Sequence, residues 1–85
     1  MTVKINSFHL SIFSLNKEIF VGEAKSVSVP GITGRLQILP HHIPLVTPLV
    51  EGDVVIEGEN KDDVLPIMGG ILEVGRKEVI ILADF

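Results

Sequence analysis

The chain has 85 residues, enough for one domain, and 46% of them are hydrophobic. A single core of this size requires most of these hydrophobic residues. A formal charge of −4 without any basic cluster argues against direct binding of nucleic acid. The absence of cysteine excludes a disulfide framework, a thiolate zinc site and a thiol nucleophile, and is typical of a reducing compartment. We therefore expect a soluble intracellular protein with one domain over residues 1–85 and neither a signal peptide nor a transmembrane segment.

Apolar residues recur with the period of two that is typical of β-strands. Near the N-terminus Phe8, Leu10 and Ile12 share one parity, and further on Val27 and Val29 alternate with serines. Later strands are predicted in short aliphatic runs at residues 53–58, 64–68, 71–74 and 78–84. Turn-forming residues separate the strands at residues 14–17, 22–23, 30–31, 40, 51–53, 58–63, 69–70 and 75–77.

This pattern predicts an all-β fold, an antiparallel β-sandwich of about ten short strands in a single domain. No stretch of the chain has helical periodicity. Parallel pairing is not expected, because parallel neighbours are usually joined by crossover helices, for which there is no room. The predicted core consists of Leu10, Ile12, Val27, Val29, Ile56, Ile71, Val79 and Ile81.

The most unusual stretch is PGITGRLQILPHHIPLVTPLV, residues 30–50. In it, Pro40 and Pro44 bracket His41 and His42. Because each proline fixes φ and removes an amide donor, the bracketed segment is predicted to be a rigid loop or the end of an edge strand. Such a loop suits docking onto a partner. The histidines are not expected to bind a metal, because adjacent residues of an extended chain point to opposite faces and no third ligand is clustered with them.

No motif of catalysis or cofactor binding is found. Serine, histidine and aspartate occur without a GxSxG elbow, and no GKS or GKT follows Gly69-Gly70, which we interpret as a bulge or tight turn. The acidic run GENKDD lacks the ligand ladder of a calcium loop and is predicted to be a solvated hairpin tip. We therefore expect neither an enzyme nor a bound cofactor.

Four longer motifs, in a fixed order, cover almost the whole chain. They are IFVGEA at residues 19–24, VPG at 29–31 leading into GRLQILPHHIPLVT at 34–47, GGILEV at 69–74 and VIILAD at 79–84. The epsilon subunit of rotary ATP synthases has similar segments in the same order, namely LFSGEV, then VPG and GELGILPGHxPLxT, then GG[IF]LEV, and VxVLAD or VxILAD. The chain thus resembles the N-terminal β-sandwich domain of that subunit.

The resemblance implies a non-catalytic subunit of the central stalk, which couples the gamma subunit to the membrane rotor ring during ATP synthesis or ATP-driven ion transport. It also implies a ten-stranded sandwich, peripheral to the membrane on its cytoplasmic face. The implied interface with the rotor ring or the gamma subunit consists of Arg35, Leu36, Gln37, His41, His42, Ile43, Pro44 and Thr47. The residues expected to form structural turns are Pro30, Gly31, Gly34, Gly69 and Gly70.

The chain departs from the family pattern in two ways. Arg35 replaces the usual acidic residue, and Gln37 and His41 replace glycines. Because like charges slow docking, we expect that the ring loop opposite Arg35 is acidic or neutral, or that the contact with the ring differs from the one in the family. Full-length members continue past the LAD motif into a helical hairpin that can inhibit the catalytic head and in some cases binds ATP. That route of inhibition is expected to be missing unless this chain is part of a longer one.

Two functions of other classes remain open. Lipoyl and biotinyl carrier domains are also small acidic β-sandwiches, and they carry a modified lysine at a hairpin tip. Lys61 would be that lysine here, although Asn60-Lys61-Asp62 matches the carrier tips poorly. The other alternative is an adaptor sandwich with an unrelated partner, because a fold does not fix a function.

Overall fold

The fold is built from short β-strands. The computed structural model describes residues 6–85, and nine strands lie in that range. They are β1 (Phe8–Ser14), β2 (Lys17–Ala24), β3 (Ser26–Gly31), β4 (Gly34–Ile38), β5 (Leu45–Leu49), β6 (Gly52–Glu57), β7 (Asp62–Ile67), β8 (Gly69–Val74) and β9 (Glu78–Asp84). The predicted all-β fold is confirmed, with nine described strands where about ten were expected. Residues 6–85 include no helix that is long and apolar enough to cross a membrane.

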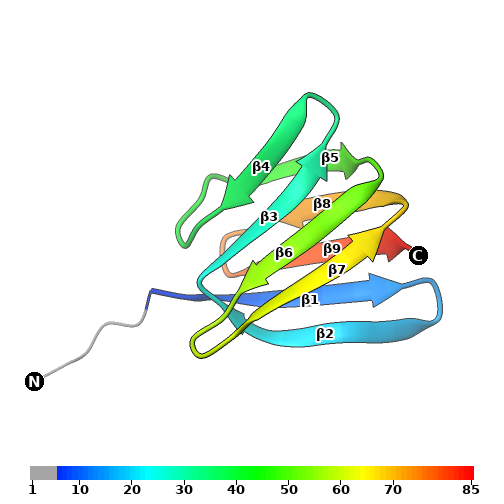
Figure 1. The fold of residues 1–85 in the computed structure, drawn as a ribbon. Helices are drawn as coiled ribbons and strands as arrows, with labels where there is room; N and C mark the ends of the chain where they lie inside the picture. Colours follow the sequence, from blue (N-terminus) through cyan, green and yellow to red (C-terminus); the bar gives the residue numbers. More distant parts are fainter. Residues whose placement is uncertain (1–5) are drawn as a thin grey trace, which may run out of the picture.

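The strands form one curled sheet that folds over into two layers (Figure 1). The order is β2-β1-β9-β8-β5-β3-β6-β7, and β4 branches off by pairing with β3. One layer contains β2, β1, β9, β8 and β5, and the other contains β4, β3, β6 and β7. Gly31 in β3 pairs with Leu49 in β5 and joins the two layers. The edge strands β2 and β7 approach each other around a gap lined in part by Phe20 and Leu65.

The prediction of a purely antiparallel sheet is wrong at one pair of strands. β1 and β9 run parallel, from His9 opposite Glu78 to Phe13 opposite Leu82. The other strand pairs of the described part of the chain are antiparallel. A crossover helix is needed only when parallel neighbours follow each other in sequence. Here β2 to β8 form the connection between the first strand and the last.

The core lies between the layers and is aliphatic. Its most deeply buried large side chains are Leu10, Ile12, Val27, Val29, Ile38, Val54, Leu72 and Ile81. All but one of the predicted core residues are buried, and the exception is Ile71, which is 49% exposed. Alternation along β8 turns Leu72 and Val74 inward, so Ile71 and Glu73 face outward. Because residues 71 and 72 are both aliphatic, the sequence pattern could not decide which of them faces the core.

The predicted turn at residues 22–23 is also wrong. Gly22 and Glu23 lie inside β2, where they pair with Leu10 and His9. A Cβ at Gly22 would lie 3.5 Å from the ring of Phe20. The small residue therefore leaves room for a neighbouring aromatic side chain and does not reverse the chain.

The residues expected to form structural turns lie beside the turns. In the β3–β4 hairpin, Ile32 and Thr33 form the turn itself. On either side of them lie the strand-end residues Pro30, Gly31 and Gly34. The first residues of β8, Gly69 and Gly70, follow a bend at Met68 in the same way.

Gly70 should tolerate a side chain far less well than its neighbour Gly69. Its φ is 155°, and a Cβ there would collide with the carbonyl of Leu82 in β9, whereas a Cβ at Gly69 would lie 3.5 Å from its nearest neighbour, the carbonyl oxygen of Leu49. We expect Gly70→Ala to lower the free energy of unfolding by roughly 2–4 kcal/mol and Gly69→Ala by less than about 1 kcal/mol. Urea denaturation of the two variants measures the difference. Equal losses would contradict the close approach at Gly70.

Candidate functional site

The residues predicted to form the interface lie on two strands and on the loop between them. Arg35, Leu36 and Gln37 belong to β4, Thr47 belongs to β5, and the others lie in residues 39–44, called here the 39–44 loop. Arg35 and Gln37 face outward, while Leu36 packs against the core and Thr47 is half-buried. The structure therefore separates the predicted interface residues into those on the strands and those in the loop. Arg35 lies near the start of β4, and the 39–44 loop follows the end of that strand.

The 39–44 loop is held by hydrogen bonds of its own backbone and of one imidazole. The amide of His42 donates to the carbonyl of Leu39 at 3.2 Å, and Nδ1–H of His42 donates to the carbonyl of Ile43 at 2.9 Å. His41 has a φ of 67°, in the left-handed region that favours glycine, and it stands where the family pattern has a glycine. Ile43 is 75% exposed. The loop thus presents a defined tip with an imidazole and an aliphatic side chain.

A second surface, absent from the sequence prediction, covers the outer face of the layer that contains β1, β9, β8 and β5. Two rows of cross-strand partners run over this face. The first row is Pro48, Ile71, Leu82 and Phe13. The second row is Val46, Glu73, Ile80 and Ser11. We call this surface, with its outward apolar residues Phe13, Val46, Pro48, Ile71, Ile80 and Leu82, the apolar face.

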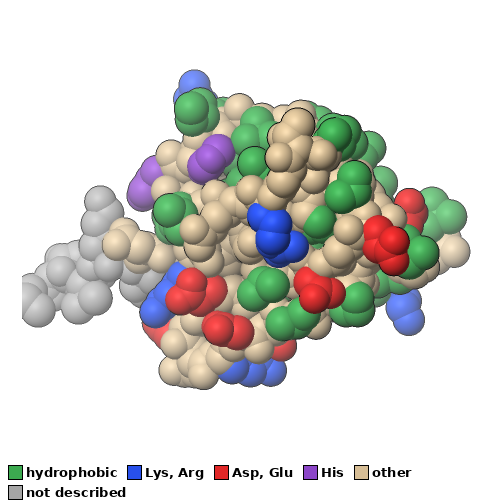
Figure 2. Space-filling model, turned by 45° about the horizontal axis from the view of Figure 1, so that its top comes forward, with side chains coloured by type: hydrophobic (Ala, Val, Ile, Leu, Met, Phe, Trp, Pro, Cys, Tyr) green, Lys and Arg blue, Asp and Glu red, His purple; other side chains and the backbone are tan. Residues whose placement is uncertain are grey.

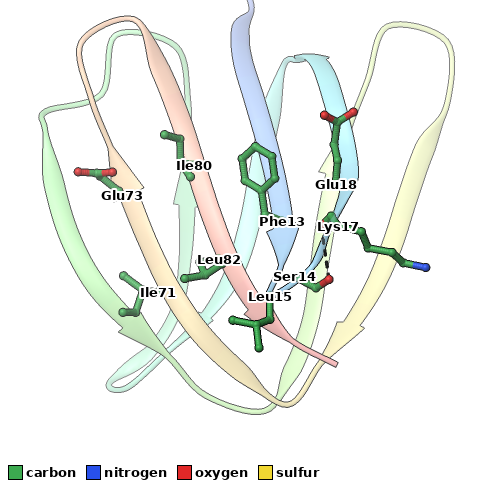
Figure 3. A pocket seen from close by; sticks show the side chains of 9 residues that line it. All are labelled: Phe13, Ser14, Leu15, Lys17, Glu18, Ile71, Glu73, Ile80 and Leu82. Carbon is green, nitrogen blue, oxygen red and sulfur yellow. Dashed lines mark hydrogen bonds between the residues drawn. The ribbon is translucent and has the colours of Figure 1, made fainter.

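A groove of about 540 Å³ lies on the apolar face beside the β1–β2 turn. Figure 3 shows apolar side chains from β1, β8 and β9 in this groove, with Glu73 on one side and Glu18 on the other. Leu15, in the β1–β2 turn, is 89% exposed and lies at one end, and Lys17 points away. An apolar floor between two carboxylates suits a partner that presents aliphatic side chains together with lysine or arginine.

The outer face of the other layer has a different character. Arg35 on β4, Asp53 and Glu57 on β6, and Asp62 on β7 are exposed there, beside Val64, which is 59% exposed. Figure 2 shows acidic, basic and apolar side chains interspersed over the side of the molecule that it presents. The two outer faces therefore differ in their polarity, and the apolar face is the one with the composition of a protein interface.

The remaining polar residues form surface contacts. Within residues 6–85, no three histidine, aspartate or glutamate side chains are grouped so that they could hold a metal ion. His9 lies 3.5 Å from Glu23 across the β1–β2 pair. In the β6–β7 connection, the side chain of Lys61 is 80% exposed and lies 4.0 Å from the carboxylate of Asp63. The arrangement offers surfaces for binding rather than a group of reacting side chains.

The apolar face carried a signal in the sequence. VIIL, at residues 79–82, is apolar at four consecutive positions, so both parities of β9 are aliphatic. Residues 71 and 72 repeat this feature in β8. A strand that is apolar on both faces needs something to cover each of them. In this chain only one of these faces is covered by the described part of the molecule.

Two curated proteins similar to this chain are ATP synthase epsilon chains. The ATP synthase epsilon chain of Delftia acidovorans is 40% identical over 81 residues, which are 94% of this chain and 59% of that relative. The ATP synthase epsilon chain of Herminiimonas arsenicoxydans is 42% identical over 81 residues, covering 93% of this chain and 58% of the relative. The chain thus spans less than two thirds of the length of these curated relatives.

Two solved structures share the fold. A chain in the cryo-EM structure of the Euglena gracilis mitochondrial ATP synthase, containing OSCP, F1 and the c-ring, superposes with a TM-score of 0.88 and 21% identity over 99% of this chain and 54% of that one. A chain in the central stalk and c-ring structure of the Tetrahymena thermophila mitochondrial ATP synthase gives a TM-score of 0.79 and 14% identity over 98% of this chain and 67% of that one.

The family model described as the ATP synthase delta/epsilon chain β-sandwich domain matches residues 7–85. This match covers the four motifs and the nine described strands. The resemblance drawn from the motifs is confirmed: the chain belongs to the family of the ATP synthase delta/epsilon chain, β-sandwich domain.

Proposed function

We propose that this domain is a non-catalytic part of the central stalk of a rotary ATP synthase and couples the gamma subunit to the membrane rotor ring. The observation that carries the proposal is the apolar face, because exposed aliphatic side chains in two cross-strand rows are typical of a surface that a stable partner covers. Family membership over residues 7–85 supplies the kind of complex in which such a partner occurs.

The apolar face is proposed as the gamma-binding surface. A lasting contact between two subunits favours a large apolar area, and this face offers Ile71 at 49% and Leu82 at 48% exposure near its centre. The flanking carboxylates of Glu18 and Glu73 would pair with basic side chains at the rim of gamma.

The 39–44 loop is proposed as the ring-binding surface. His41, Ile43 and Pro44 are exposed at its tip, and the hydrogen bonds of His42 hold the tip in one shape. A loop that is ordered before binding loses less conformational entropy when a partner contacts it. With gamma on one face and the ring at one end, the domain would be held at the cytoplasmic face of the membrane by its partners.

The carrier interpretation of Lys61 has no support that distinguishes it from membership of the ATP synthase family. It rested on a small acidic β-sandwich with a lysine at a hairpin tip, and both features are present. However, they are equally compatible with a member of the ATP synthase family, and the sequence around Lys61 does not resemble a carrier tip. A carrier function is therefore not favoured for Lys61.

Capture assays with purified subunits test the proposed function. We expect the folded, tagged chain to retain both the gamma subunit and detergent-solubilised rotor rings from the same organism. Ile43→Asp should reduce capture of the ring by about tenfold or more, because it places a carboxylate in a contact that is being buried, and should leave capture of gamma unchanged.

The matched control is Ile32→Asp. Ile32 is 63% exposed in the β3–β4 turn, so the substitution is the same and the setting is also an exposed turn, but on a different connection. It should capture gamma and ring like the unaltered chain. If the folded unaltered chain captures neither subunit, the proposed function is wrong. If Ile32→Asp and Ile43→Asp weaken ring capture equally, the ring does not dock on the 39–44 loop.

A further inference from the structure

The side chain of Arg35 is bound within its own sheet. In the β3–β4 hairpin Arg35 lies opposite Pro30. Its Nε and Nη2 donate to Oγ of Ser28 in β3 at 3.1 and 3.0 Å, and Nη2 also donates to the backbone carbonyl of Asp53 in β6 at 2.7 Å. One guanidinium therefore connects β4 to β6 across β3.

The carbonyl of Asp53 needs such a donor because a proline faces it. The β3–β6 pairing runs from Ser26 opposite Glu57 to Ser28 opposite Val55, and continuing this register would place Pro30 opposite Asp53. Glu57, which has the same parity as Asp53, accepts from the amide of Lys25 next to β3, so the carbonyl of Asp53 also points toward β3. Proline has no amide hydrogen, so Pro30 cannot supply the usual ladder bond to this carbonyl.

The position of Pro30 is itself fixed by close packing. A Cβ on Gly52 would lie 2.8 Å from Cβ of Pro30, so the two strands approach closely at this point. The carbonyl of Pro30 accepts from the amide of Val50 at 2.9 Å. A ring without an amide hydrogen is thus held directly beside the Asp53 backbone, and the donor has to come from elsewhere.

We propose that Arg35 is a positioning residue: its guanidinium supplies the hydrogen-bond donor that Pro30 lacks, and thereby fixes the start of β4 to β6. The inference deepens the proposed function, because β4 leads into the 39–44 loop. It rests on the proposed function in one respect, namely that this loop meets the ring. It also accounts for the charge found here. An acidic side chain at this position could accept from the Ser28 hydroxyl but would offer no donor to the Asp53 carbonyl, whereas arginine donates to both.

Amide hydrogen exchange on the isolated 85-residue chain tests the proposal without any partner. We expect Arg35→Ala to speed exchange of the β4 amides by about tenfold, while β9, far along the sheet, is unchanged. Ser28→Ala, which removes one acceptor and keeps the bond to Asp53, should give about a threefold increase. Arg35→Lys keeps the charge but not the fork of donors, so it should restore less than half of the protection.

The decisive variant restores the missing amide. In a Pro30→Ala background, residue 30 can donate to Asp53 itself, so adding Arg35→Ala should speed β4 exchange by no more than about threefold. The proposal is overturned if the tenfold effect persists in that background, or if Arg35→Ala leaves β4 exchange unchanged. It is also overturned if Arg35→Ala weakens ring binding with no change in β4 exchange, because Arg35 would then contact the ring directly. Failure of the chain to bind gamma or ring leaves these exchange results intact and bears on the proposed function alone.

Discussion

Replacing Leu82 by glutamate should weaken binding of the domain to the gamma subunit by about 100-fold or more. Leu82 lies between Ile71 and Phe13 in the first row of the apolar face and is 48% exposed in the free chain. Under the proposed interface it becomes buried, and a carboxylate buried without a partner costs several kcal/mol, of which about 3 kcal/mol corresponds to 100-fold. The carboxylates of Glu73 and Glu18 on either side of the groove add like-charge repulsion.

The control for this experiment is Val64→Glu. Val64 is 59% exposed on β7, on the mixed outer face, so it tests the same kind of substitution away from the proposed contact. We expect its affinity for gamma to stay within about threefold of the unaltered chain, measured by calorimetry with purified gamma. Both variants should keep their stability within about 1 kcal/mol, because both side chains face solvent. Equal affinity losses, or normal binding by Leu82→Glu, would show that gamma does not cover the apolar face.

Addition of a partner strand at the β7 edge is not favoured. The free edge of β7 carries Pro66, which has no amide hydrogen, and the charged residues Asp62 and Asp63. Asp63 lies opposite the buried Ile56 and therefore points toward the gap between the layers. Prolines and inward-pointing charges of this kind prevent an edge strand from pairing with another chain. Strand addition at the β7 edge is therefore disfavoured, whereas the apolar face remains open to a partner.

Much of the fold could be predicted from the sequence because alternation is a local signal. The run EVIILAD was predicted at residues 78–84 and forms β9 over the same residues. The parallel pairing of β1 with β9 could not be predicted in this way, because it joins the two ends of the chain and depends on how the whole sheet curls. The parity of β8 was lost for a different reason. Where neighbouring residues are both aliphatic, the alternation of apolar and polar residues is missing, and the sequence does not show which of them faces the core.

The candidate site was predictable only where the chain itself imposes rigidity. Pro40 and Pro44 mark the 39–44 loop, which the structure shows as the connection between β4 and β5. The positive φ of His41 is consistent with the glycine that the family pattern has at this position. The role of Arg35 was not predictable, because it depends on Pro30 lying beside Asp53, a residue far away in sequence on another strand.

Ile71 and Leu72 provide the sharpest separation of core from interface, because they are adjacent in β8 and face opposite sides. Leu72 is 0% exposed and Ile71 is 49% exposed. We expect Leu72→Ala to lower the free energy of unfolding by roughly 2–5 kcal/mol, since it removes buried methyl groups and leaves a cavity. Ile71→Ala should cost about 1 kcal/mol or less, because much of its surface is already in water. Urea denaturation measures both values.

Binding to gamma should rank the same two variants in the opposite order. Ile71→Ala truncates a side chain at the proposed interface, so we expect about tenfold weaker binding by a chain of nearly normal stability. Leu72→Ala should bind gamma within about threefold of normal under conditions where it remains folded, because Leu72 does not reach the surface. If Ile71→Ala destabilises the chain as much as Leu72→Ala, β8 has the opposite parity and the apolar face does not exist as described. If Ile71→Ala is stable and binds normally, the face exists but gamma binds elsewhere.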